Sequence, residues 1–154
     1  MNNAEKQFVH ILSAGIRGKA ADKIYENVEW DEVIDLANKH KVEGIVYLAL
    51  RKSNLVSKIG EKRLSLLKQK AAITGIGQSR HISGLSIVFN KIIEENIPVI
   101  VLKGLVVRDF YPQPDQRTMS DADILVHKDN VEKVKNLLID MGYIFLEDHK
   151  ASHH

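Results

Sequence analysis

A pair of aspartates, one residue apart at the start of an apolar run, constrains this sequence most. Asp121 and Asp123 lead into residues 124–126, Ile-Leu-Val, which are typical of a short buried strand. In a strand, side chains at positions i and i+2 point to the same face, so both carboxylates are expected to project together. Close carboxylates repel each other unless a cation or a proton neutralises them. The pair therefore predicts a site for a divalent cation, with a solvated strand start as the plainer alternative.

A second segment lies upstream of the aspartates. Residues 97–102 predict a short buried strand with Pro98 at its start, where the missing N–H is tolerated. The strand leads into Lys103-Gly104 and then into residues 105–111, which have helical spacing. A strand, a turn and a helix start place backbone N–H groups and a positive helix end together, which favours phosphate. Lys103 adds a cation at this point, although an ordinary strand-to-helix turn would look the same.

The order of these segments carries a resemblance. A strand, a glycine turn, a helix, a polar loop and an Asp-x-Asp strand resemble the core of the nucleotidyltransferase fold shared with DNA polymerase β. More narrowly, the sequence resembles a family of uncharacterised bacterial nucleotidyltransferase-like proteins. The residues that carry this resemblance are Leu102-Lys103-Gly104, Tyr111-Pro112, Arg117, residues 120–126 and Met141-Gly142-Tyr143. The sequence departs from the superfamily pattern in the turn, because Leu105 follows Gly104 where Ser or Gly is usual.

The resemblance implies a fold and a division of the chain. The expected fold is α+β, with a helical N-terminal region packed on a small mixed β-sheet of nucleotidyltransferase type. The strands are expected near residues 98–102, 122–127 and 143–147. The helical region would span residues 1–95 and the nucleotidyltransferase-like core residues 96–154. Because members of this family are typically longer, we expect the sequence to be an N-terminal fragment.

The resemblance also implies a chemistry. Asp121 and Asp123 would be the catalytic pair and would hold Mg²⁺ (or Mn²⁺) that bridges a nucleoside triphosphate. The nucleotide and its phosphates would be bound by Lys103, Gly104, Arg117 and Ser120. The implied reaction transfers a nucleotidyl group to an acceptor, a protein or a small molecule, which the sequence does not identify.

One expected catalytic group is hard to find in the sequence. Active enzymes of this fold use a third carboxylate, from a neighbouring strand, to activate the acceptor hydroxyl. Glu147 and Asp148 are the nearest candidates, and neither lies inside an apolar strand pattern. The alternative is therefore a degenerate, non-catalytic module of the same fold that binds a nucleotide or a partner. Two other Asp-x-Asp enzyme classes fit less well: sugar-nucleotide glycosyltransferases open with strands, and haloacid-dehalogenase-type phosphatases place the acids after the strand.

The first part of the chain predicts helices. Apolar residues recur at helical spacing within residues 4–17, 30–37 and 42–49. Residues 57–95 indicate one long helix or two abutting helices. Gly75-Ile76-Gly77 interrupts this pattern and is expected to mark a bend, or a place where another helix packs closely; it is no dinucleotide-binding fingerprint, because no strand precedes it.

Composition narrows the remaining classes. The net charge of +2 makes a nucleic-acid partner unlikely, and the helix–turn–helix pattern at His40-Lys41 has no other support. The chain has no cysteine, which excludes disulfides and thiolate metal sites. Without a signal peptide or a membrane-length apolar stretch, a cytoplasmic protein with no membrane partner is expected. His149, His153 and His154 lack a third metal ligand and are expected to form a tail. The oligomeric state is not predicted.

Overall fold

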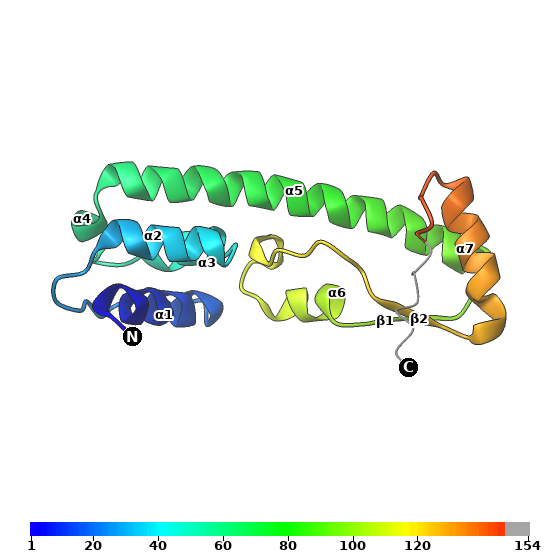
Figure 1. Cartoon of the computed structure of the whole chain (residues 1–154), viewed down its shortest axis with the longest axis horizontal. Coiled ribbons are helices and arrows are strands. Elements are labelled where there is room, and N and C mark those ends of the chain that lie inside the picture. Colours follow the sequence, from blue (N-terminus) through cyan, green and yellow to red (C-terminus); the bar gives the residue numbers. More distant parts are fainter. Residues whose placement is uncertain (147–154) are drawn as a thin grey trace, which may run out of the picture.

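The structure, a computed structural model, describes residues 1–146 and is organised along one long helix. Figure 1 shows this helix, α5, running the length of the molecule, with α1–α4 along one half and α6, the strands and α7 along the other. The elements are, in chain order, α1 (Asn3–Ile16), α2 (Trp30–Lys39), α3 (Glu43–Leu50), α4 (Val56–Ile59), α5 (Glu61–Glu94), β1 (Val99–Val101), α6 (Gly104–Val107), η1 (Arg108–Phe110), η2 (Pro114–Gln116), β2 (Ile124–Val126), η3 (Lys128–Asn130) and α7 (Val131–Asp140).

The three predicted N-terminal helices are confirmed as α1, α2 and α3. α1 begins at a capping box, in which the Asn2 side chain accepts the Glu5 N–H (2.8 Å) and the Glu5 side chain accepts the Asn2 N–H (2.9 Å). The helices bury a cluster of apolar side chains that we call the N-terminal core. Its largest fully buried members are Ile11, Val33, Val46, Leu50, Ile59 and Leu67.

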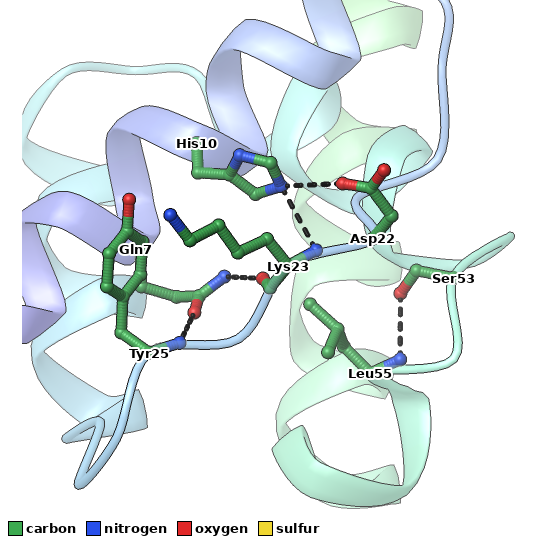
Figure 2. A network of polar contacts seen from close by, with 7 residues as sticks. All are labelled: Gln7, His10, Asp22, Lys23, Tyr25, Ser53 and Leu55. Atoms are coloured by element: carbon green, nitrogen blue, oxygen red, sulfur yellow. Dashed lines mark hydrogen bonds and ion pairs between the residues drawn. The ribbon is translucent and has the colours of Figure 1, made fainter.

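A buried glutamine fixes the loop between α1 and α2. Gln7 is fully buried, and its amide donates to the Lys23 carbonyl (2.9 Å) and accepts the Tyr25 N–H (2.9 Å) (Figure 2). The ring of His10 contacts the Lys23 N–H (3.2 Å) and the Asp22 carboxylate (3.1 Å). Because a buried amide without partners costs about 1–3 kcal/mol, these bonds hold the loop against α1.

α5 is one continuous helix, which settles the alternative left open by the sequence. Gly75 and Gly77 do not end it. A Cβ on Gly75 would lie 3.1 Å from Gln116 Nε2, so the element that packs closely there is the loop containing η2 and not a helix. A Cβ on Gly77 would meet nothing within 4 Å. No helix within residues 1–146 is both long and apolar enough to cross a membrane.

The sheet is smaller than predicted and is antiparallel, not mixed. β1 pairs with β2 so that Val99 lies opposite Val126 and Val101 opposite Ile124. Val99, Ile124 and Val126 pack against α5 and α7 in a second cluster, the C-terminal core. The buried members of this core are Val88, Ile92, Ile97 and Val134. The sheet is therefore covered by the C-terminal half of α5 together with α7.

The third predicted strand is wrong for the residues that the structure describes, because residues 143–146 form no strand. Gly142 adopts a φ of +90° after α7, which turns the chain back on the helix. The Tyr143 N–H then donates to the Leu138 carbonyl (2.9 Å), and the Lys135 ammonium lies 4.1 Å from the Phe145 ring. Because this segment returns along α7, it does not pair with the sheet.

Candidate functional site

The pairing of β1 with β2 brings the two predicted site segments together. The strands are antiparallel with Val101 opposite Ile124, so the residues that follow β1 lie beside those that precede β2. The Leu102 N–H donates to the Asp123 carbonyl (2.9 Å), which extends the pairing by one residue. Lys103 and Asp123 are thereby placed next to each other.

Asp121 and Asp123 lie just before β2. This strand is shorter than the one predicted near residues 122–127, because regular pairing begins only at Ile124. Asp123 pairs with one cation, and Asp121 lies near enough to add to the negative charge around it. Lys103 Nζ lies 2.9 Å from Asp123 Oδ2. The hydrogen bond to Asp123 and its charge, together with the charge of Asp121, raise the pKa of Lys103 above its usual value. The ammonium thus stays charged beside the two acids at neutral pH.

The turn that follows β1 differs from a simple glycine turn. Lys103 has φ 44° and ψ −110°, a conformation that favours glycine, while Gly104 has no positive φ. A Cβ on Gly104 would meet its nearest neighbours at 3.6–3.9 Å, which is ordinary contact. The predicted helix over residues 105–111 is only one turn of α6 followed by η1, so its dipole is small. The cationic group that this turn presents is the Lys103 side chain, and a helix end adds little to it.

Arg117 approaches the same turn from the loop before β2. Its Nη1 lies 3.6 Å from the position that a Cβ on Gly104 would occupy, and its guanidinium carbon lies 5.9 Å from the centre of the Tyr111 ring. Arg117 Nε is buried and has no hydrogen-bond partner within residues 1–146. Buried donors are nearly always paired, so this one is a candidate to bind a ligand or a water molecule. Ser120 is exposed next to Asp121.

Sequence reasoning missed one residue of this region, Gln78 in α5. Its side chain accepts the Met119 N–H (3.1 Å) and donates to the Met119 carbonyl (3.1 Å). Met119 lies two residues before Asp121, so α5 contacts the start of the acid-bearing segment. The available signal was a polar residue on an apolar stripe, since Gln78 lies midway between Ala71 and Leu85 at a heptad spacing.

Both predicted metal ligands, Asp121 and Asp123, lie among the described residues. Within residues 1–146, no group of three or more His, Asp or Glu side chains gathers in a way that could hold a metal ion. Mg²⁺ is usually bound by one or two carboxylates together with substrate phosphates. Asp121 and Asp123 therefore fit a metal ion that is shared with a phosphate ligand. The candidates for the third carboxylate and the histidine tail lie outside the described residues, at Glu147, Asp148, His149, His153 and His154.

Comparison with known proteins gives one match. The model of a family described as uncharacterised nucleotidyltransferase matches residues 26–154. No curated protein and no solved structure matches the chain. The matched range contains every helix from α2 onward, including the whole of α5, together with both strands, the Lys103 turn and the two aspartates.

Proposed function

The chain belongs to the uncharacterised nucleotidyltransferase family, and from that premise we propose that it binds a nucleoside triphosphate with Mg²⁺ (or Mn²⁺) and transfers a nucleotidyl group. The observation that carries the proposal is the contact between the Lys103 turn and the acid pair, with Lys103 Nζ 2.9 Å from Asp123 Oδ2. A cation and two carboxylates at one place can bind the phosphates and the metal ion of one ligand. We propose a cytoplasmic location, where triphosphates are made, and an acceptor that is a protein or a small molecule.

Each residue has a distinct part in this proposal. Asp121 and Asp123 would hold the metal ion through their carboxylate oxygens, and the bound ion would supply a Lewis acid at the phosphates. Lys103 is 77% exposed, so its ammonium can leave Asp123 and turn to the β- and γ-phosphates. Arg117 would donate to the leaving pyrophosphate. Gly104 and Ser120 would lie under the phosphates, where their small size leaves room for close approach.

A second candidate has its own support. The ion pair between Lys103 and Asp123 neutralises one acid without a metal ion, as a structural lysine would. Within residues 1–146, no third carboxylate lies close to Asp121 and Asp123. The ion pair between Lys103 and Asp123 therefore favours a degenerate domain. Such a domain would bind a nucleotide or a partner and would transfer nothing.

Calorimetry tests whether the site binds metal and nucleotide. Mn²⁺ is titrated into the full chain with and without each nucleoside triphosphate, using the parent chain and the Asp121→Asn/Asp123→Asn variant. The Asp129→Asn/Asp140→Asn variant is the control, because it removes the same charge from exposed positions around α7. We expect the control to match the parent and the site variant to bind at least about tenfold more weakly, the effect of losing about 1.4 kcal/mol. Equal affinity in all three chains would show that the acid pair holds no metal.

A labelling experiment separates transfer from binding. The chain is incubated with Mg²⁺ and a cell extract, in parallel with triphosphates labelled at the α- or the γ-phosphorus. Nucleotidyl transfer moves only the α-label to the acceptor, and this transfer should be lost in Asp123→Asn, which keeps the side chain's size but removes its charge. Binding without transfer of either label would favour the non-catalytic module.

A further inference from the structure

We propose that Gln78 is a positioning residue that acts from α5 through the backbone of Met119 and holds Asp121 and Asp123 beside the Lys103 turn. The inference rests on the proposed nucleotide site. It adds to that site a residue of α5, which precedes both the Lys103 turn and the two aspartates in the sequence. In this role α5 contributes directly to the geometry of the site, in addition to packing against the strands.

The contact between Gln78 and Met119 is reciprocal. The side-chain amide accepts the Met119 N–H and donates to the Met119 carbonyl, both at 3.1 Å and both partly buried. One amide that satisfies both backbone groups of a residue does what a neighbouring strand does in a ladder, and fixes both the position and the rotation of that peptide segment. Any loop conformation that moves Met119 leaves these groups without partners, which is costly away from water.

The acid-bearing segment is tied at both of its ends. Gln78 holds it at Met119, and the Leu102 N–H holds it at Asp123 (2.9 Å). Only residues 120–122 lie between these two anchors, and Asp121 is the middle one. The position of Asp121 relative to Lys103 therefore depends on both anchors, one from the sheet and one from α5.

Other contacts hold the loop further upstream and make the effect of Gln78 local. Gln116 Nε2 donates to the Ala71 carbonyl (3.2 Å), and the Thr118 hydroxyl donates to the Lys41 carbonyl (3.2 Å). These bonds remain when Gln78 is replaced. A variant at Gln78 should therefore release Met119 and the acids after it without detaching the whole loop from the helices.

The test uses the full chain and three glutamine variants. Gln78→Met keeps a side chain of similar length without hydrogen bonds. Gln69→Met makes the same change at an exposed position of α5. Gln7→Met removes a similar reciprocal amide pair from the N-terminal core, far along the chain from the acids. We expect Gln78→Met to weaken binding of Mn²⁺ with triphosphate about tenfold, and Gln7→Met to lower the melting temperature with no change in affinity below it.

A second measurement needs no ligand. Met119 N–H should be protected from hydrogen exchange in the parent chain and in Gln69→Met, and exposed in Gln78→Met. In Gln78→Glu at neutral pH, the carboxylate can still accept the Met119 N–H but cannot donate to the Met119 carbonyl and repels it, whereas the protonated acid can donate and accept as glutamine does. The protection of the Met119 N–H in Gln78→Glu, relative to the parent at the same pH, should therefore lie between those of Gln78→Met and the parent at neutral pH, and should rise as the pH falls towards about 5.

The outcomes separate this inference from the proposed function. If the parent chain binds no triphosphate, the proposed function fails, and the exchange of Met119 still tests the contact that Gln78 makes. If the parent binds and a folded Gln78→Met variant binds equally well, the positioning role is overturned. It is also overturned if Gln7→Met loses affinity as much as Gln78→Met does, because the loss would then reflect general destabilisation, or if Met119 stays protected in Gln78→Met.

Discussion

Lys103 combines a strained backbone with an exposed ion pair. Its φ of 44° with ψ of −110° is sparsely populated by residues with a Cβ, and its ammonium lies 2.9 Å from Asp123 Oδ2. The pair faces solvent, where an isolated ion pair contributes little to stability. Strain of this kind persists where the surroundings fix the chain, and it is often found at functional sites. A lysine at a position that suits glycine is thus explained more readily by binding than by folding.

Two substitutions at Lys103 separate the backbone from the charge. Lys103→Gly and Lys103→Ala both remove the ammonium, but only glycine relieves the strain. We expect Lys103→Gly to be more stable than Lys103→Ala by about 1–2 kcal/mol in urea unfolding. Both variants should lose affinity for triphosphate to the same extent. Equal stability of the two variants would mean that the turn relaxes to a negative φ once lysine is replaced.

At this scale the sequence predicted the charged groups and missed the contacts that place them. The spacing of Asp121 and Asp123 and the position of Lys103 after a strand were readable from residue types alone. Gln78 was not, because its partner Met119 lies 41 residues away. The positive φ at Lys103 could not be predicted from residue types either, since glycine adopts positive φ most readily and Gly104 is the next residue.

Among the elements, the packing of the η2 loop between α3 and α5 depends on glycine. A Cβ on Gly44 in α3 would lie 1.6 Å from Gln116 Oε1 and 2.6 Å from Gln116 Cδ. Gln116 is held there by its bond to the Ala71 carbonyl of α5 (3.2 Å). The close approach joins the N-terminal helices to the loop that leads to the aspartates.

Alanine at different glycines should have effects of opposite sign. Gly44→Ala would push Gln116 out of its place and break the bond to Ala71, so we expect a loss of about 1–3 kcal/mol. Gly77→Ala has open space within 4 Å in the middle of α5 and should gain about 1 kcal/mol from helix propensity. Thermal unfolding of both variants measures this. A destabilised Gly77→Ala chain would contradict the open surroundings of that position.

Elements were predicted well where one segment decides its own structure. Periodicity found α1, α2, α3 and α5, because each carries an apolar face of several turns. It failed for residues 143–146, whose apolar side chains suit a strand but whose backbone turns back on α7 after Gly142. A segment becomes a strand only if it can pair with the free edge of a sheet. The local sequence pattern does not show whether such an edge lies next to the segment.

On the scale of the whole molecule, one helix serves two cores. α5 contributes Leu67 to the N-terminal core, and Val88 and Ile92 to the C-terminal core. The division at residues 95 and 96 remains a prediction about which residues carry the nucleotidyltransferase motif. Packing indicates that residues 96–154 need α5 in order to fold, because two of the four buried residues of the C-terminal core, Val88 and Ile92, precede this boundary.

Two fragments test that condition. Residues 61–154 keep α5, Val88, Ile92 and the contact from Gln78 to Met119, and we expect this fragment to unfold cooperatively in urea. Residues 96–154 lack these groups. Burial of a valine or isoleucine contributes about 1.5–3 kcal/mol, and small domains are stable by only about 5–15 kcal/mol. We therefore expect the shorter fragment to show no cooperative transition by circular dichroism. A cooperative transition in residues 96–154 would instead show that the motif folds without α5, and the positioning role of Gln78 would then act on an already stable domain.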